Sequence, residues 1–218
     1  MTPEKSQSTI NVNLGQILMM VAGTYPSLLD ATLEQVQNAL DAKATVIGIR
    51  INLKKRGLDI VDNGQGVTRI KFERCLTQIG KTVKSRDKMG RWGRGMISYL
   101  GKCDKFTFTS CYYRKTPDQT GFLEWSFSTA DIEGMSDAGA IPLRDRSEIK
   151  YHASRTNPKR HKPGAEFFVP WRTRIKAWGI VKDRTITRMT AQDLAEQILD
   201  KFGPVMRKLD TVVHIDFI

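Results

Sequence analysis

Residues 28–42 of this chain read LLDATLEQVQNALDA, and residues 46–67 read VIGIRINLKKRGLDIVDNGQGV. Apolar residues in the first stretch recur at the three- and four-residue spacing of one helix side: Leu29, Leu33, Val36 and Leu40. Ser27, followed three residues later by Asp30, has the arrangement of a capping box. The first stretch is therefore predicted to be a helix with one buried side that begins after Ser27.

The second stretch predicts a β-hairpin, because β-branched and apolar residues fill 46–53 and 58–62 on either side of a Lys-Lys-Arg-Gly turn. The other expected strands are 105–113, 121–128, 166–170 and 211–218. The other expected helices are 68–79, 96–100 and 191–209, the last broken near Gly203 and Pro204. Helices mixed with neighbouring strands indicate an α+β fold, a two-layer sandwich in which helices cover one face of a sheet.

The size of the chain fits one domain. It has 218 residues and 24.7 kDa, with 40% hydrophobic and 27% charged residues, and no repeat is visible. Residues 1–218 are therefore predicted to form a single domain, with 134–164 as a basic, turn-rich excursion on its surface. The chain stops within an apolar strand, which predicts the N-terminal part of a longer protein; a natural terminal strand is the alternative.

Several classes of protein are excluded by composition. No apolar run approaches the roughly 20 residues that cross a bilayer, and Met1–Asn13 lacks the order of a secretory signal. The cysteines, Cys75, Cys103 and Cys111, have neither disulfide-framework nor zinc-site spacing. The expected protein is cytoplasmic, or nuclear in a eukaryote, and has no membrane partner.

The net charge of +12 is concentrated in two segments. Residues 143–188 carry thirteen Lys or Arg against four Asp or Glu, and residues 69–94 carry nine against two. Such segments attract polyanions, either nucleotide phosphates or a nucleic-acid backbone. The expected nucleic-acid contacts are Arg155, Lys159, Arg160, Lys162, Arg172 and Arg174. A solvated basic surface without a partner is the alternative.

The predicted helix carries a polar ridge opposite its apolar side. Glu34, Asn38 and Asp41 lie at positions i, i+4 and i+7, within an arc of roughly 60°. A solvated polar face is the ordinary explanation of such a ridge. The functional explanation is a carboxylate that polarises water beside an amide oxygen that binds Mg²⁺, which accepts one protein ligand together with phosphate oxygens and water.

Two glycine-rich segments complete the pattern. Residues 62–67, DNGQGV, follow a buried strand and combine a strand-end aspartate with a backbone that a flat ligand can approach. Residues 90–95, GRWGRG, precede an apolar helix, where free N–H groups can bind phosphate. A tight turn and a flexible connection are the respective alternatives. Gly80-Lys81-Thr82 is not the end of a P-loop, because Cys75 occupies the position of the required first glycine.

In this order the three segments resemble the GHKL ATPase superfamily of gyrase, heat-shock chaperones, histidine kinases and MutL. The motif E-x-x-x-N-x-x-D-A falls on Glu34, Asn38, Asp41 and Ala42; D-x-G-x-G falls on Asp62, Gly64 and Gly66; G-x-x-G-x-G falls on Gly90, Gly93 and Gly95. Residues 79–84, IGKTVK, are similar to the lid of the chaperone and MORC branches. The matched core spans about 28–110.

The resemblance implies a Bergerat fold, with a mixed, mostly antiparallel sheet, helices on one face and a mobile ATP lid. It implies Glu34 as general base, Asn38 as Mg²⁺ ligand, and Asp62 as acceptor for the adenine amino group, with Gly64 and Gly66 giving the base room. The residues expected to bind ATP are Asn38, Asp41, Ala42, Asp62, Gly64, Gly66, Val67, Thr82, Lys84, Gly90, Gly93, Arg94, Gly95 and Met96.

The implied function is Mg²⁺-dependent ATP binding and hydrolysis, with lid closure controlling homodimerisation or a partner that includes nucleic acid. Gyrase and MutL take a phosphate-contacting lysine from a following domain, so slow or partner-dependent turnover is expected. The family also has a Gly-Thr pair whose threonine supports the adenine contact. The nearest match is Gly164-Ala165, which has no hydroxyl, so either the motif lies elsewhere or water replaces that contact.

Two other functions remain open. A histidine-kinase catalytic module would use the same nucleotide site but needs a phosphoacceptor histidine on a helix, and none of His152, His161 and His214 lies on a predicted one. A nucleic-acid-binding module with ATP as its regulator would use the basic segment, in which Tyr151, Trp171 and Trp178 could stack on bases.

Overall fold

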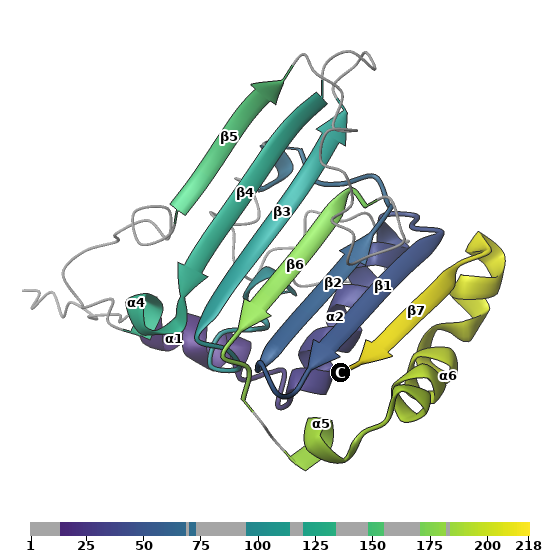
Figure 1. Cartoon of the computed structure of the whole chain (residues 1–218). Coiled ribbons are helices and arrows are strands. Elements are labelled where there is room, and N and C mark those ends of the chain that lie inside the picture. The colour runs from purple at the N-terminus through teal and green to yellow at the C-terminus, as the bar shows by residue number, and fades with distance from the viewer. Residues whose placement is uncertain are drawn as a thin grey trace, which may run out of the picture.

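The computed structural model describes residues 14–68, 70–72, 95–113, 120–133, 148–154, 171–181 and 184–218. Its centre is one seven-stranded sheet, drawn face-on in Figure 1. Across the sheet the strands are β5 (Glu148–Ser154), β4 (Thr120–Ser128), β3 (Lys105–Tyr113), β6 (Thr173–Trp178), β2 (Gly57–Asp62), β1 (Val46–Asn52) and β7 (Val212–Phe217). Only the β1–β7 pair is parallel. The predicted mixed, mostly antiparallel sheet is confirmed.

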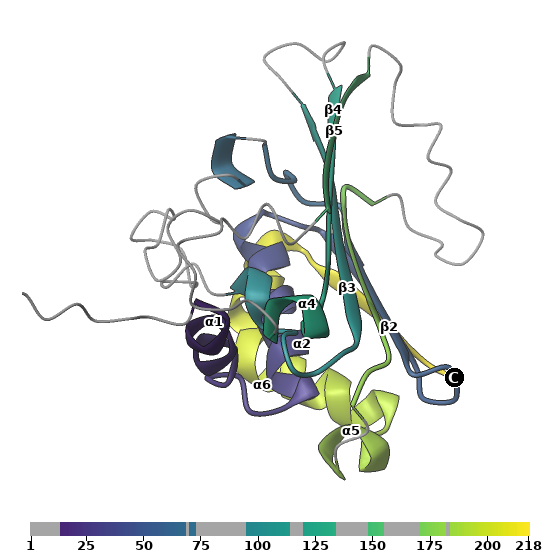
Figure 2. The ribbon, with the colours of Figure 1, turned by 90° about the vertical axis from the view of Figure 1, so that its left-hand side faces the viewer.

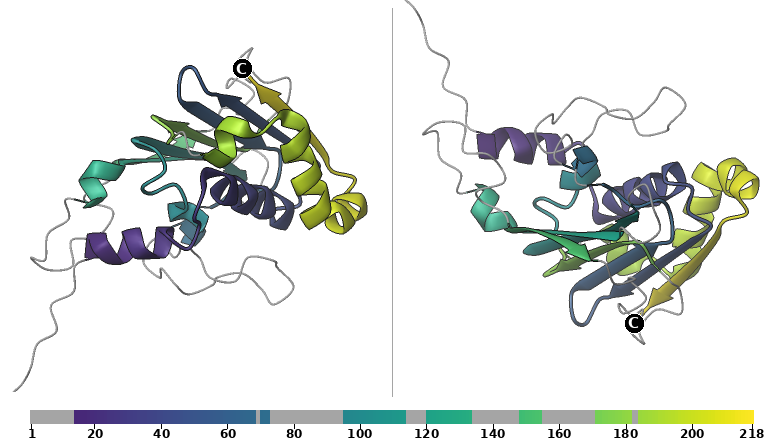
Figure 3. Two further views of the ribbon diagram at one scale, coloured as in Figure 1. Left: turned by 90° about the horizontal axis from the view of Figure 1, so that it is seen from below. Right: turned by 90° about the horizontal axis from the view of Figure 1, so that it is seen from above.

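The helices lie on one side of this sheet, as the edge-on view in Figure 2 shows. They are α1 (Leu14–Ala22), α2 (Leu28–Asp41), the 3₁₀ turn η1 (Gly95–Ile97), α4 (Thr129–Glu133), α5 (Arg184–Arg188) and α6 (Ala191–Leu209). Seen along the sheet, α6 lies beside β7, α2 beside α6, and α1 beside α4 (Figure 3). The predicted two-layer α+β sandwich is confirmed.

The core lies between the two layers because inward-facing apolar residues alternate along every central strand. Ile47, Ile49 and Ile51 of β1 are fully buried, and Leu28, Val36 and Leu40 of α2 pack in the same cluster. Under β3 and β4 the core is aromatic: Phe72, Phe106, Trp125 and Phe127 contact one another in stacked, tilted or edge-on pairs.

The opposite face of the sheet has charged residues paired across strands. Arg50 Nε donates to Asp216 Oδ2 at 2.9 Å, joining β1 to β7. Arg174 of β6 forms a two-point ion pair with Asp59 of β2. A sheet face with paired charges can be exposed to solvent, and this agrees with the described helices lying on the opposite, apolar face.

The structure confirms α2, its Ser27–Asp30 capping box and the 46–62 hairpin. Three predictions are wrong. The helix 191–209 is continuous through Pro204, because the burial of Leu194, Ile198, Phe202 and Met206 in the core outweighs the cost of the proline. The predicted helix 96–100 contains only the 3₁₀ turn η1. The predicted excursion at 134–164 contains the edge strand β5.

Four elements were not predicted at all: α1, α4, α5 and β6. The expected strand 166–170 lies outside the described residues, as does the expected helix 68–79 beyond its first turn. Among the helices that the structure describes, none combines the length and apolar character that a bilayer crossing demands.

Candidate nucleotide site

The side chains of Glu34 and Asn38 meet the main chain of Gly95. A Cβ placed on Gly95 would stand 2.6 Å from Glu34 Oε1 and 2.7 Å from Asn38 Nδ2. Any other residue at this position would have to displace the ends of these two side chains. The first and third motifs, about 60 residues apart in sequence, are therefore in contact through the residues that the sequence singled out.

The second motif meets the C-terminal end of the same helix, at its cap residue Ala42. A Cβ on Gly64 would stand 2.8 Å from the Ala42 Cβ and 2.9 Å from Asp62 Oδ1. Gln65 N donates to the Ala42 carbonyl at 2.9 Å, which ties the turn after β2 to the end of α2. Gly64 is thus required by the close packing of the chain against itself, a reason separate from the predicted one of making room for a base.

Gly66 holds the turn against β3. Its φ is +70°, and a Cβ there would stand 2.3 Å from the Cys111 carbonyl oxygen. The next residue, Val67, donates its N–H to Ser110 Oγ at 2.7 Å. The turn is therefore fixed on both sides, by α2 through Ala42 and by β3 through Ser110.

Asp62 is the buried acid of the site, with only 7% of its surface exposed. Its Oδ1 accepts from Gly64 N at 2.8 Å. Burial raises the pKa of Asp62 to about 6, against the opposing effects of the Gly64 N–H, the Thr173 hydroxyl and the Arg172 charge. Above that pH it is a buried carboxylate, which can accept strongly from a ligand amine.

Thr173, which the sequence did not single out, places a hydroxyl beside Asp62. It is the first residue of β6, stands opposite Asp62 in the β2–β6 ladder, and its side chain hydrogen-bonds Asp62. Gly164 and Ala165, the nearest sequence match to the family's Gly-Thr pair, lie outside the described residues, and the residue before Thr173 is Arg172 rather than glycine. The signal was present in the alternation of Thr173, Ile175 and Ala177, all buried, with exposed or half-buried neighbours.

Gln35 is a further residue that the sequence did not single out. It lies between Glu34 and Asn38 on α2, is buried, and hydrogen-bonds Asn38 as well as the Gly95 carbonyl. Asp41, the last motif residue of α2, is also buried.

Most of the remaining predicted contact residues lie outside the part of the chain that the structure describes. Outside the described residues lie Thr82, Lys84, Gly90, Gly93, Arg94, Arg155, Lys159, Arg160 and Lys162, and of Met96 only the main chain is described. Arg174 is paired with Asp59, and Arg172 Nη1 approaches the Gly64 carbonyl at 3.5 Å. Arg172 therefore lies beside the second motif, and both nucleic-acid assignments stay predictions.

The donor set fits a nucleotide with a hard cation. Asn38 offers an amide group and Glu34 a carboxylate at the η1 end of the site, and Asp62 offers a buried acceptor at the other. In the part of the chain that the structure describes, no three His, Cys, Asp or Glu side chains are grouped to hold a metal alone. A cation at Asn38 would thus take most of its ligands from phosphate and water, as Mg²⁺ does.

Comparison with known families supports this arrangement. A family model described as "Histidine kinase-, DNA gyrase B-, and HSP90-like ATPase" matches residues 26–157, which contain all three motifs. No curated protein matches the chain. With the motif residues joined as described and more than half of its length matched, the chain belongs to the histidine kinase-, DNA gyrase B- and HSP90-like ATPase family.

Proposed function

We propose that this domain binds ATP with Mg²⁺ and hydrolyses it, with closure of its lid controlling dimerisation or a partner. One observation supports this most strongly. The C-terminal half of α2 and its cap residue meet two different glycine motifs, Glu34 and Asn38 at Gly95 and Ala42 at Gly64 beside Asp62. The eight residue-to-residue steps from Glu34 to Ala42 span about 12 Å, a length that a nucleoside triphosphate can bridge.

The adenine end of the proposed site is Asp62. Its carboxylate would accept from the exocyclic amino group, which guanine does not have at that position. Thr173 orients the carboxylate by a hydrogen bond, and Arg172 favours its ionised form. Because Asp62 is buried, its carboxylate has lost hydrogen bonds to water, and the adenine amine would replace one of them. Guanine could not, and this supports selectivity for ATP over GTP.

The phosphate end is formed by Glu34, Asn38 and the η1 main chain. Asn38 would hold Mg²⁺, which neutralises charge on the phosphate oxygens when it is bound. Glu34 would accept a proton on its carboxylate from the attacking water, whose oxygen bonds to the γ-phosphorus as the bond to the bridging oxygen of ADP breaks. Gly95 keeps the two side chains side by side at the phosphate end.

The proposed lid belongs to a strongly basic segment of the chain. The assigned lid residues are Thr82, Lys84, Gly90, Gly93 and Arg94, in a segment with nine basic and two acidic residues. That charge suits a triphosphate, and binding energy spent on closing such a segment is a common way to shift an equilibrium between assembled and free states.

The rate of phosphate release tests the assignment of Glu34 as the general base. Glu34→Ala should lower the steady-state rate at least about a hundredfold, because it removes the general base. ATP affinity should largely survive this change, since Asp62 and Asn38 remain. Equal rates for Glu34→Ala and wild type would reject hydrolysis at this site.

The alternative functions are less well supported. Of the three histidines, His152 and His214 lie on strands, so neither has the helical setting of a phosphoacceptor in a kinase. Nucleic-acid binding rests on the thirteen basic residues of 143–188. A salt titration of binding to duplex and single-stranded DNA tests it, because contacts to several phosphates weaken steeply as salt rises.

A further inference from the structure

We infer that Gln35 is a positioning residue that fixes the orientation of the Asn38 amide and so prepares it to hold the cation. The inference rests on the proposed function, in which Asn38 is the Mg²⁺ ligand. Gln35 lies directly after the proposed general base on α2, and only 6% of its surface is exposed. Its side chain contacts the third motif on one side and Asn38 on the other.

The orientation of the Gln35 amide is set by its partners. Nε2 donates to the Gly95 carbonyl at 2.8 Å and to Ser98 Oγ at 3.2 Å. The Gly95 carbonyl can only accept, and the Ser98 hydroxyl already donates its hydrogen to that carbonyl at 2.9 Å. Both neighbours therefore require a donor, so the NH₂ group of Gln35 must face η1 and its oxygen must face away.

The Gln35 oxygen then sets the orientation of Asn38. Asn38 Nδ2 donates to Gln35 Oε1 at 3.3 Å. Because the nitrogen and oxygen of an amide point in different directions, this bond turns Asn38 Oδ1 away from Gln35. The opposite rotamer would place two amide oxygens together in a buried setting, which is unfavourable.

The result is a chain of hydrogen bonds in which each donor and acceptor is fixed. This relay runs from the Gly95 carbonyl through the Gln35 amide to the Asn38 amide, and would end at the cation. Outer groups of this kind orient metal ligands, and their loss commonly lowers metal affinity by about 10- to 100-fold. The relay also begins at the main chain of the third motif. A shift of η1 would therefore change the orientation of the metal ligand on α2.

The test separates metal-dependent from metal-independent nucleotide binding. ATP affinity is measured calorimetrically in excess Mg²⁺ and in EDTA, for wild type, Gln35→Met and the control Gln37→Met, which makes the same change two residues along the same helix. Methionine has a similar length but cannot donate to Gly95 or accept as an amide oxygen. The Mg²⁺ gain is the ratio of the ATP affinity in Mg²⁺ to that in EDTA. Gln35→Met should make this gain about tenfold smaller and should change the affinity in EDTA by no more than about twofold.

A second variant covers the case in which Gln35→Met does not fold. Ser98→Ala removes one of the two acceptors of Gln35 Nε2 and leaves the Gly95 bond, so it should reduce the Mg²⁺ gain by less, about threefold. The double variant should be no worse than Gln35→Met alone, because both act through one amide. In the metal-free protein, the side-chain NH₂ resonances of Asn38 should move in Gln35→Met and not in Gln37→Met.

The outcomes distinguish this inference from the proposed function. A wild type that binds no ATP, or binds it equally with and without Mg²⁺, overturns the proposed function. A wild type with a clear Mg²⁺ gain that Gln35→Met retains overturns only the role of Gln35. Equal losses in Mg²⁺ and in EDTA also overturn it, because they indicate a general packing role.

Discussion

The two ends of the β2–β6 ladder are built from the same kinds of residue but differ in burial. At one end Asp62 pairs with Thr173, next to Arg172 and the positive-φ glycine Gly66. At the other end Gly57 pairs with Trp178, next to Arg56, Asp104 and the positive-φ glycine Gly179. We refer to these as the site end and the junction end.

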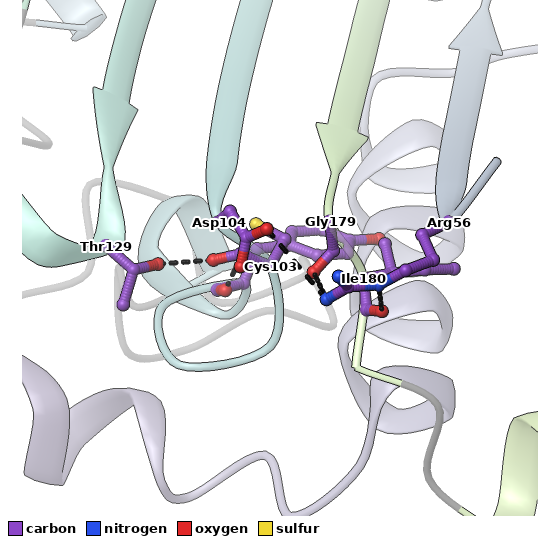
Figure 4. Close-up of polar contacts among 7 residues, drawn as sticks. Arg56, Cys103, Asp104, Thr129, Gly179 and Ile180 are labelled. Carbon is purple, nitrogen blue, oxygen red and sulfur yellow. Dashed lines mark hydrogen bonds and ion pairs between the residues drawn. The ribbon is translucent and has the colours of Figure 1, made fainter.

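The junction end is a structural corner, shown in Figure 4. Arg56 donates to the Gly179 carbonyl at 2.9 Å and to the Ile180 carbonyl at 3.1 Å. The Asp104 side chain, 3.8 Å from the Arg56 guanidinium, is 74% exposed. An exposed carboxylate keeps its water, so this ion pair contributes little to stability and nothing to ligand chemistry.

The contrast shows that burial, more than residue type, separates the proposed binding site from a structural corner. Asp62 has lost its water and is held by Gly64 and Thr173, and its pKa has moved to about 6. Each prediction below changes one end and uses the other as its control, or asks how far the burial of Asp62 accounts for the difference.

The largest effect is expected at the glycines. Gly66→Ala should lower the free energy of unfolding by about 3–5 kcal/mol, because its φ is positive and its Cβ would meet the immobile Cys111 carbonyl. Gly179→Ala should cost about 1–3 kcal/mol, because its Cβ would meet the Asp104 side chain, which can move. Chemical denaturation measures both. Gly57→Ala, with open space around it, is the control, and a reversed order would contradict the comparison.

The pH dependence of stability comes next. The folded state raises the pKa of Asp62 from 3.8 to about 6, so it binds a proton more tightly than the unfolded chain does. The ionised Asp62 therefore destabilises the ligand-free fold above about pH 6, and this cost disappears below about pH 4. Asp62→Asn should raise the free energy of unfolding by up to about 3 kcal/mol at about pH 7.5. Denaturation at a series of pH values should find no difference near pH 4; a constant difference would reject the titration.

Nucleotide affinity should separate the two aspartates. Asp62→Ala should weaken ATP binding about a hundredfold, since it removes a charged acceptor from a buried site. Asp104→Ala should leave the affinity unchanged, because its carboxylate is at the junction end and exposed. Calorimetric titration of both variants measures this. Comparable losses in the two would mean that the site end is not where adenine binds.

The smallest effect is expected from Arg172. Its charge opposes the rise in the pKa of Asp62, so Arg172→Met should raise that pKa further. The acid limb of ATP binding should then move to higher pH, by less than about one unit. The reference profile is Asp62→Asn, which has no carboxyl to titrate there. A shift to lower pH would show that Arg172 does not act through Asp62.

The parts of the site that are local in sequence could be predicted from it. The helix of Glu34 and Asn38, with its Ser27 cap, and the turn after β2 follow from periodicity and from glycine positions. Thr173 could not be placed, because its role depends on pairing with Asp62 across a sheet. Gln35 was missed for a similar reason: its partners Gly95 and Ser98 are 60 and 63 residues away.

Propensity rules failed where tertiary contacts decided the outcome. Pro204 predicts a broken helix, but α6 continues because its buried residues pack against the core. The short helix α1 has neither an acidic first turn nor a basic last turn to mark its ends. A residue distant in sequence stabilises its C-terminal end instead: Lys102 Nζ donates to the Ala22 carbonyl at 3.1 Å.

The pairing of β2 with β6 also has a consequence for folding. Residues Gly64 and Arg172, which it brings together, are 108 positions apart in the chain, whereas α2 and the β1–β2 hairpin form from neighbours. Closing so long a loop costs entropy before any contact compensates it, so this pairing belongs among the late steps of folding. A newly made chain would thus have α2 and Asp62 before the β6 partner of Asp62 is in place, and the proposed nucleotide site would be complete only when the sheet is.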